Sequence, residues 1–422
     1  MFGCGPKEEG SIPSFRPSVD NRGEKMTNEN IEKVKGFRDI FAPQSVRREK
    51  IIEIMREKAK IFGFMPVETP TIEYEDLLKG DNESDEAVSD RFRLKDKGNR
   101  DLGLRFEFTF QLSRILKEFP NVKMPWRRYQ TGNVFRDEPL RPDRFREFSQ
   151  FDVDIIGDDS ISADAECLAF ANSVLEELKI KGEIKVNNRK LLNSIMEKAR
   201  IVKNQQQVLR EIDKLDKIGE KDVKANMGKV ISASQVKEVF SLLQKDLDYF
   251  IDKGFPGAEE VKQLENLGKS YGFKIVFTPT LMRGFSYYTG NVFEIWSKEK
   301  KASLAGGGRY DDKVGKYVNR KIPAVGISFG TLIDYDGIDI LDKSTKYLVV
   351  SLGQDKKAVE LAKKLRSKGE SCIIYYGKPS KALEYANSHF IQKTIFVGEK
   401  EVKAKKFKVK DMKSGKESLL KI

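Results

Sequence analysis

The stretch FRDEPLRPDRFREFSQFDVDIIG, residues 135–157, combines a basic loop with an apolar run that contains acidic residues. Together with the preceding RRYQTGNVF, it predicts two antiparallel strands around the loop PLRPDR. The arginines around this loop are Arg136, Arg141, Arg144 and Arg146. Because guanidinium groups bind phosphates in a bidentate manner, the hairpin is a candidate cradle for a triphosphate.

The second strand of this hairpin carries polar side chains in an apolar run. Gln150, Asp152 and Asp154 alternate with apolar residues, so we expect them on one face of the strand. Buried polar groups are costly without partners, and this favours a ligand on that face. Phe148 is placed where an adenine base could stack.

The segment LRFEFTF, residues 104–110, has a carboxylate close to a hydroxyl group. Glu107 and Thr109 are two residues apart on an expected strand, so both face the same side. This pair suits an ammonium group. Taken alone, it is also typical of an exposed strand face.

Two later segments allow a functional and a purely structural interpretation. RGFSYYTGNVFE, residues 283–294, brings Arg283 close to Tyr287 and Tyr288, but it also resembles a turn before a half-buried strand. In AGGGRYDDKVG, residues 305–315, Gly306 and Gly307 permit close approach of the backbone to a ligand. The same glycines are typical of a tight bend in a strand.

The composition limits the class of protein. A chain of 422 residues predicts two or three domains, and a net charge of +13 favours a polyanionic partner such as nucleic acid. No apolar run approaches the roughly 20 residues of a membrane span. Three scattered cysteines form no disulfide framework or metal spacing, so we expect a cytoplasmic protein without a protein-held metal. The single histidine, His389, argues against histidine-based acid–base catalysis.

The residue pattern predicts a disordered extension over residues 1–30 and a catalytic domain over 31–338. Within the latter, a helical pattern runs through VRREKIIEIMREKAKIFGF, MPVETPTIEY reads as a strand, and a hairpin turns at Gly98 and Asn99. Residues 188–263 show only amphipathic helices, which indicates a helical insertion. Residues 344–422 alternate strands with helices and predict a small α/β domain with a largely parallel sheet.

In this order and spacing, the segments resemble histidyl-tRNA synthetases, a family of class II aminoacyl-tRNA synthetases. The resemblance covers about Lys35 to the C-terminus. KGFRDIFAPQ is similar to the family's opening signature, residues 135–157 to the second class II motif, and RGFSYYTG and GGGRYD to the two histidine-specific motifs. The segment REFSQFDVDIIG resembles the archaeal and eukaryotic branch of the family.

The resemblance implies an α+β fold: a class II antiparallel sheet flanked by helices, a helical insertion and a C-terminal α/β anticodon-binding domain. It implies a histidine–tRNA ligase that uses ATP with Mg²⁺, L-histidine and tRNA(His). It also implies a homodimer, with an interface around the helix from Val46 to Phe62 and the strand after it.

The resemblance also implies roles for individual residues. Arg136 would hold the α-phosphate of ATP, Arg144 would reach the distal phosphates, and Arg283 would be the cation beside the reacting carboxylate. Glu138 would read the adenine amino group above Phe148. The residues implied for histidine binding are Glu107, Thr109, Gln150, Asp154, Tyr287, Tyr288, Gly306 and Gly307.

Several positions depart from the family pattern, and the mildest change is Glu107 and Phe108 where the nearer branch tends to have aspartate and leucine. Ile333 stands where the third class II motif has an arginine for the γ-phosphate, and Ser286 stands where aspartate is usual. These departures leave two alternatives: a regulatory protein like the regulatory subunit of ATP phosphoribosyltransferase, and a tRNA-binding paralogue without ligase activity. Retention of Arg136, Glu107, Gln150 and Arg283 favours the enzyme.

Overall fold

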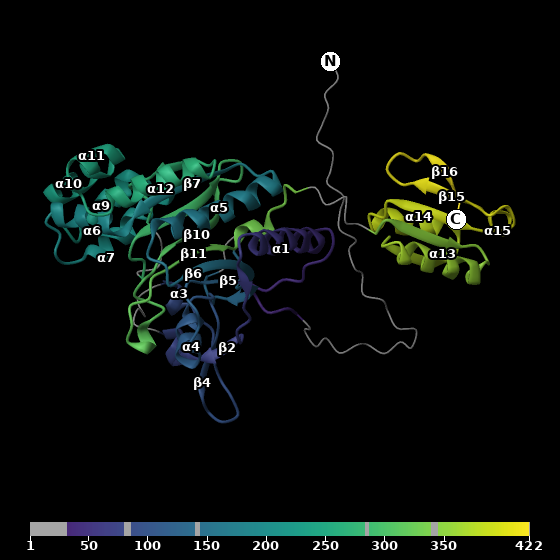
Figure 1. The fold of residues 1–422 in the computed structure, drawn as a ribbon, viewed down its shortest axis with the longest axis horizontal. Coiled ribbons are helices and arrows are strands. Elements are labelled where there is room, and N and C mark those ends of the chain that lie inside the picture. Colours follow the sequence, from purple (N-terminus) through teal and green to yellow (C-terminus); the bar gives the residue numbers. More distant parts are fainter. Residues whose placement is uncertain (1–31, 80–85, 140–143, 283–286, 339–344, 422) are drawn as a thin grey trace, which may run out of the picture.

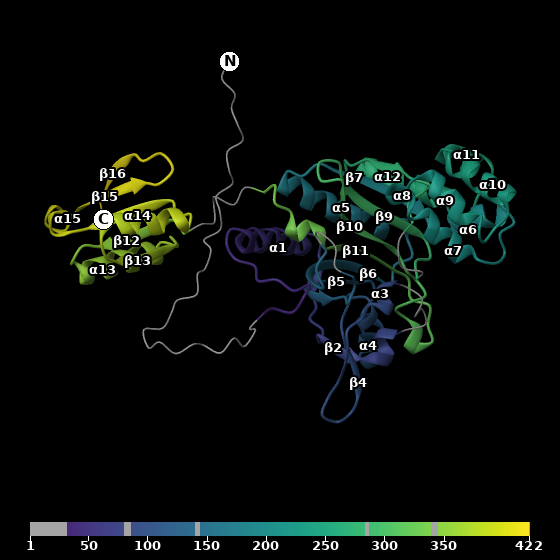
Figure 2. The same ribbon diagram turned by 180° about the vertical axis from the view of Figure 1, so that it is seen from behind.

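The computed structural model describes residues 32–79, 86–139, 144–282, 287–338 and 345–421 (Figures 1 and 2). An eight-stranded sheet with the order β1-β5-β6-β11-β10-β9-β7-β8 forms its centre. The inner strands are antiparallel, and the two edge pairs, β1 with β5 and β7 with β8, are parallel. The strands are β1 (Met65–Pro66), β5 (Trp126–Phe135), β6 (Glu147–Ile156), β7 (Gly182–Asn188), β8 (Ile275–Phe277), β9 (Asn291–Ser297), β10 (Ala302–Arg309) and β11 (Ala324–Phe329).

Two long helices, α1 (Gln44–Ile61) and α5 (Ile161–Leu178), pack against one face of this sheet. Alternation along β6 explains why that face is apolar, since Phe151, Val153 and Ile155 join the core that also contains α1 and α5. The opposite face of β6 is therefore left to Gln150, Asp152 and Asp154, as the alternation predicted.

A three-stranded sheet of β2 (Ile72–Tyr74), β4 (Asp101–Leu104) and β3 (Arg93–Lys95) lies beside the main sheet. The predicted hairpin is present, with Asn99 in the left-handed region at φ 57°. The single strand predicted for MPVETPTIEY is wrong, because β1 and β2 are separate and belong to different sheets. The helices of this region are α2 (Glu75–Lys79), α3 (Glu86–Ser89) and α4 (Phe110–Glu118).

The helical region between β7 and β8 lies at one end of the main sheet in both views (Figures 1 and 2). Its amphipathic helices bury their apolar faces in a core continuous with that of the sheet. The helices are α6 (Arg189–Lys198), α7 (Gln205–Ile212), α8 (Leu215–Ile218), α9 (Glu220–Met227), α10 (Ala233–Leu243), α11 (Leu247–Asp252) and α12 (Ala258–Ser270). Two 3₁₀ turns complete this part of the chain: η1 (Lys316–Val318) lies between β10 and β11, and η2 (Thr331–Asp334) follows β11.

Residues 345–421 form a separate five-stranded sheet with the order β13-β12-β14-β15-β16. The predicted alternation of strands and helices is present, and the first three strands are parallel. The last two strands lie in a lysine-rich stretch and are antiparallel additions to the largely parallel sheet that the sequence predicted. The elements are β12 (Tyr347–Ser351), α13 (Asp355–Ser367), β13 (Cys372–Tyr376), α14 (Pro379–Ser388), β14 (Lys393–Val397), α15 (Glu399–Ala404), β15 (Lys406–Asp411) and β16 (Glu417–Lys421).

Candidate active site

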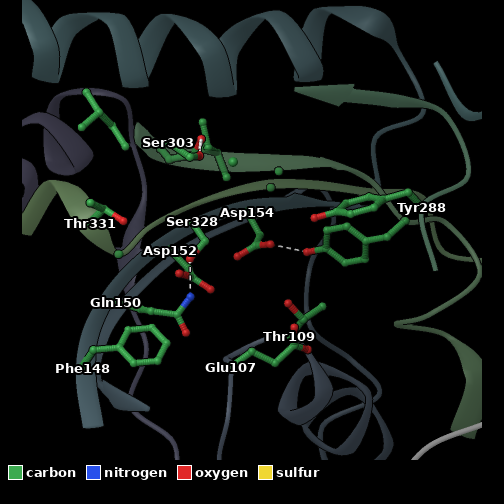
Figure 3. A pocket seen from close by; sticks show the side chains of 18 of the residues that line it. Glu107, Thr109, Phe148, Gln150, Asp152, Asp154, Tyr288, Ser303, Ser328 and Thr331 are labelled. Atoms are coloured by element: carbon green, nitrogen blue, oxygen red, sulfur yellow. Dashed lines mark hydrogen bonds between the residues drawn. The ribbon is translucent and has the colours of Figure 1, made fainter. Parts of the chain in front are cut away.

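A cavity of about 290 Å³ lies on the polar face of β6 (Figure 3). It receives side chains from β6, β10 and β11, from the loop before α4 and from the residues before β9. Phe148 and Thr331 lie at one end and Tyr288 lies at the other (Figure 3). The residues from the sequence-based site that line it are Glu107, Thr109, Arg136, Arg144, Phe148, Gln150, Asp154, Tyr287, Tyr288, Gly306 and Gly307.

Of the two remaining predicted residues, one lines another cavity and the other is not among the described residues. Glu138 lines a second cavity of about 610 Å³, which shares Arg136, Arg144 and Phe148 with the first. Arg283 lies outside the described residues, as do Ser286, Arg141 and the N-terminal extension 1–30. The structure therefore brings together segments from four distant parts of the sequence around one pair of connected cavities.

Glu107 and Thr109 reach the cavity by a route that the sequence did not suggest. They were expected on a strand, but β4 ends at Leu104. Glu107 lies in the following irregular segment, and Thr109 directly precedes α4. The tight connection, and not strand alternation, turns both side chains toward the cavity (Figure 3).

Glu107 is a buried carboxylate with an incomplete set of partners. The hydroxyl of Tyr287 donates to its Oε2 at 3.1 Å, whereas Oε1 has no hydrogen-bond partner among the described residues. Burial raises the pKa of Glu107 to about 7, and the positive charge of Lys313 opposes that shift. A ligand that carries an ammonium group would supply a partner for Oε1 and lower this pKa.

Asp154 is held by two partners that sequence reasoning missed. Arg128 lies opposite it on β5, and its Nη2 is 2.6 Å from Oδ2, while the hydroxyl of Tyr310 donates to Oδ1. Burial raises the pKa of Asp154, and Arg128 opposes that shift. On β11, a Cβ at Gly326 would lie only 2.0 Å from Oδ1, so glycine is needed there to admit the carboxylate.

Asp152 also lines the cavity, although it was not chosen as a site residue. Its Oδ1 has no hydrogen-bond partner within the described part of the chain. Burial raises its pKa to about 7, with Arg128 opposing the shift. The neighbouring Gln150 donates from Nε2 to the Ser328 hydroxyl at 2.6 Å, which orients the amide and leaves its Oε1 without a partner among the described residues. The signal for Asp152 was its place in the alternating polar face.

The other end of the cavity is cationic. The Arg136 guanidinium lies 5.0 Å above the Phe148 ring, and its Nε donates to the Phe106 carbonyl at 3.2 Å. Burial lowers the pKa of Arg136, but an arginine remains charged at neutral pH. Arg144 is exposed and pairs with Glu138 at 2.9 Å. An arginine that stacks on an aromatic ring is a suitable platform for a phosphate next to a base.

Ile333 does not face either cavity. It lies in η2, is 1% exposed and belongs to the main hydrophobic core. Thr331 and Gly330 from the same segment line the cavities instead. The absence of an arginine at position 333 is therefore accommodated by burial of the position.

The glycine run on β10 has a packing role. A Cβ at Gly307 would lie 2.0 Å from the Gly326 carbonyl oxygen of β11. The strands approach so closely that an added methyl group would force them apart. Gly306 and Gly307 also line the cavity, so both interpretations of the run apply to one segment.

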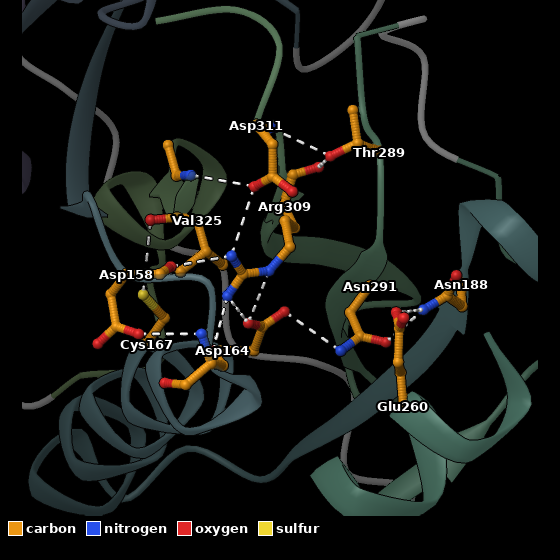
Figure 4. Close-up of polar contacts among 12 residues, drawn as sticks. Asp158, Asp164, Cys167, Asn188, Glu260, Thr289, Asn291, Arg309, Asp311 and Val325 are labelled. Atoms are coloured by element: carbon orange, nitrogen blue, oxygen red, sulfur yellow. Dashed lines mark hydrogen bonds and ion pairs between the residues drawn. The ribbon is translucent and has the colours of Figure 1, made fainter. Parts of the chain in front are cut away.

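A second buried polar cluster lies where β10 ends and β9 begins (Figure 4). Arg309 donates from Nε to Asp164 at 3.1 Å, with an ion pair through Nη2, and binds the Asp158 and Ser160 carbonyls at 2.9 and 2.8 Å. Asn291 donates to the other oxygen of Asp164 at 3.2 Å. Through Asn188 the chain of contacts continues to Glu260 on α12. This cluster ties the helical region to the strand that follows Tyr288.

Comparison with known proteins identifies the chain's relatives. Residues 36–331 match the family model of histidyl-tRNA synthetase, and residues 346–422 match that of an anticodon binding domain. Histidine–tRNA ligase 1 of Bacillus thuringiensis subsp. konkukian is 32% identical over 412 residues, which cover 92% of this chain and 97% of the relative.

Two solved structures share the fold. Histidyl-tRNA synthetase from Nostoc sp. PCC 7120 superposes with a TM-score of 0.80 at 24% identity, over 93% of this chain and 97% of that one. An ATP phosphoribosyltransferase regulatory subunit/histidyl-tRNA synthetase from Bacillus halodurans C superposes with a TM-score of 0.73 at 24% identity. The superposition covers 88% of this chain and 99% of that one. On the match over residues 36–331 and the identity across nine-tenths of its length, the chain belongs to the histidyl-tRNA synthetase family.

Proposed function

We propose that the protein is a histidine–tRNA ligase that activates L-histidine with ATP and transfers it to the 3′ end of tRNA(His). The observation that carries the proposal is the pair of connected cavities, with unsatisfied carboxylates at one end and arginines stacked on phenylalanines at the other. A substrate with an ammonium group and an imidazole fits the first end. A nucleotide triphosphate fits the second.

The acidic end would hold histidine. The α-ammonium group would lie against Glu107, Thr109 and Tyr287, where a carboxylate oxygen still lacks a partner. The imidazole would donate to Asp152, whose Oδ1 has no partner among the described residues, and would lie beside Asp154, Gln150 and Tyr288. Gly306 and Gly307 would allow close approach. Buried polar groups left unpaired by an analogue produce strong rejection of that analogue.

The reaction takes place between the two ends. A carboxylate oxygen of histidine attacks the α-phosphorus of ATP, the bond to the β-phosphate oxygen breaks, and pyrophosphate leaves. Arg136 would stabilise the charge that develops on the α-phosphate, with Arg283 as a second cation. Glu138 would read the adenine amino group over Phe148, and Arg144 would release Glu138 to reach the distal phosphates.

ATP is the co-substrate, and Mg²⁺ would enter with it. Mg²⁺ binds mainly through substrate phosphates with one or two carboxylates, and Glu138 and Asp336 supply carboxylates on the wall of the second cavity. Within the described residues no group of three or more His, Cys, Asp or Glu side chains is arranged to hold a metal by itself. The cation would compensate phosphate charge.

The remaining modules suit the same activity. We assign residues 31–338 to catalysis, 188–263 to an insertion and 344–422 to anticodon recognition, with tRNA affinity supported by the net charge of +13. The exposed apolar residues Phe41, Ile61 and Met65 near α1 suit a homodimer interface. No helix among the described residues could span a membrane, and we propose a cytoplasmic location.

The branch of the family is a finer proposal. The sequence of residues 146–157 supports placing the chain in the archaeal and eukaryotic branch, although the Bacillus relative is bacterial. A phylogenetic tree of the catalytic domain tests this assignment. Placement of the chain among bacterial sequences would contradict it.

One observation favours a second candidate function. Ile333 lies in the core, so the third motif supplies no arginine to the nucleotide. A paralogue that binds tRNA or regulates another enzyme without activating histidine would tolerate this change. The alternative predicts a folded protein without adenylate formation.

Histidine-dependent ATP–pyrophosphate exchange without tRNA distinguishes the two functions, with Arg283→Ala as the control variant. We expect exchange that requires histidine and falls sharply in the variant. A folded wild-type protein that binds tRNA but shows no exchange would support the paralogue.

A further inference from the structure

We propose that Arg38, from the segment before α1, binds the terminal phosphate of ATP and is positioned for this by Asp334. The inference rests on the proposed function, because it assigns one more contact to the same nucleotide site. It supplies the cation that position 333 does not provide.

The location of Arg38 is the first support. The cavity of about 610 Å³ continues past Arg136 and Phe148, and Arg38 and Asp334 lie on its wall. A nucleotide whose base stacks on Phe148 and whose α-phosphate contacts Arg136 has to extend its outer phosphates into one of the spaces next to these residues. The second cavity is one adjoining space of sufficient volume, and a further cavity of about 370 Å³ next to Phe148 is also lined by Arg38 and Arg48. Arg38 therefore lies on the wall of both of these spaces, which adjoin the Phe148 ring.

The charge balance around Asp334 is the second support. Asp334 accepts from Arg38 and from Arg48 of α1, so two guanidinium groups share one carboxylate. Arg48 also donates to the Ser149 hydroxyl at 2.8 Å, which fixes it to β6. The trio carries one surplus positive charge at the cavity wall. A phosphate group would neutralise that surplus.

The hydrogen-bonding state of Arg38 is the third support. Its side chain is 16% exposed and lies 3.8 Å from the centre of the Phe145 ring. Its buried Nε has no hydrogen-bond partner among the described residues. A buried donor without a partner is costly, and a phosphate oxygen would satisfy it. Because stacking and the Asp334 contact fix the plane of the guanidinium, the donor is already oriented.

Lys300 is another cation on the same wall, and it differs from Arg38 in its charge balance and in its exposure. It is 44% exposed and forms a one-to-one pair with Asp336 at 2.6 Å. Its charge is therefore already balanced by one carboxylate. Its ammonium nitrogen lies 5.7 Å from the centre of the Tyr335 ring, a longer contact than the 3.8 Å between the Arg38 guanidinium and Phe145. This makes Lys300→Ala a matched control for Arg38→Ala.

The test measures nucleotide binding as well as activity. Calorimetry gives the dissociation constants of ATP and AMP without histidine, and pyrophosphate exchange gives the KM values for ATP and histidine. For Arg38→Ala we expect ATP to bind roughly 10–100-fold more weakly, because a charge-assisted contact is lost. AMP affinity and the histidine KM should stay within about twofold. Arg38→Lys should recover part of the ATP affinity. The ATP affinity of Asp334→Asn should lie between those of the wild type and Arg38→Ala.

The outcomes separate the inference from the proposed function. An unchanged ratio of ATP to AMP affinity in Arg38→Ala overturns the inference, and so does a loss that occurs in Lys300→Ala instead. A wild-type protein without preference for ATP over AMP also overturns it. If the wild type shows no exchange while Arg38→Ala still loses the ATP preference, the proposed function fails and the phosphate contact stands. Thermal unfolding of each variant excludes loss of fold as the cause.

Discussion

Two clusters of buried polar side chains meet the same central sheet, and they differ in whether their polar atoms have partners. Around Arg309, the guanidinium, the carboxylate of Asp164 and the amides of Asn291 and Asn188 are linked in one chain of contacts (Figure 4). In the cavity, an oxygen each of Glu107, Gln150 and Asp152 has no hydrogen-bond partner among the described residues (Figure 3).

The difference indicates two uses of buried polarity. A satisfied network adds to stability and fixes the geometry of the chain around it. An unsatisfied cluster costs stability in the free protein, and a ligand that supplies the missing partners recovers that cost. Variants of the Arg309 cluster should therefore lower stability, whereas variants of the cavity should lower activity.

The largest expected difference comes from replacing one aspartate by alanine in each cluster. Asp164→Ala leaves Arg309 buried without its carboxylate, and we expect a loss of about 3–5 kcal/mol in the free energy of unfolding. Asp152→Ala removes a carboxylate that burial already disfavours, so stability should stay level or rise. Urea unfolding of both variants measures the contrast. Equal losses would remove the distinction between the clusters.

Arg136→Ala should lower activity strongly and change the free energy of unfolding little. Its guanidinium lines the cavity, and under the proposed function it would stabilise charge on the α-phosphate, so we expect roughly a 10²–10³-fold fall in exchange rate. Steady-state exchange with a parallel melting curve measures both quantities. A fall in melting temperature that accounts for the lost activity would contradict the assignment.

Glu107→Gln should have opposite effects on stability and activity. Between the unfolded-state pKa near 4 and about 7, the unfolded chain ionises while the folded carboxyl keeps its proton. The stability of the wild type therefore falls as pH rises through this window. At pH 8 the variant should be more stable by about 1–3 kcal/mol, and the two proteins should agree near pH 4.

The same variant should bind histidine more weakly at pH 8, because the ammonium group loses its carboxylate. For the wild type, histidine affinity should fall as pH drops through about 7. Unfolding curves across pH check the direction of the stability change, and histidine titrations across pH check the direction of the affinity change. A variant with the wild-type pH profile of stability would show that Glu107 does not titrate in this range.

Tyr310→Phe is the mildest change, and it tests the boundary between the clusters. It removes the hydroxyl that donates to Asp154 while the Arg128 contact remains. We expect a loss of about 1 kcal/mol in stability and a rise of roughly tenfold in the KM for histidine. Exchange kinetics with varied histidine measure this. A changed KM for ATP alone would place Tyr310 in a different role.

Much of the molecule follows from the chain itself. The order of the segments, the β5–β6 hairpin, the polar face of β6 and the alternating C-terminal elements depend on local pattern, so the sequence was enough to predict them. The resemblance to a known family likewise implied most of the polar residues that line the cavity, although not Asp152 or Tyr310. It gave no basis for splitting MPVETPTIEY between two sheets or for ending the strand before Glu107.

Only the tertiary structure decided which of these polar groups have partners. Asp154 meets Tyr310 across 156 positions of sequence, and Arg38 meets Asp334 across 296. Such contacts depend on strand register and on packing between distant segments, and neither is encoded in a local pattern. The sequence by itself determined the residue types of the site and their order. The fold determined that Ile333 is buried, that Arg309 has its polar partners, and that one oxygen each of Glu107 and Asp152 has none among the described residues, because burial and pairing are properties of the assembled chain.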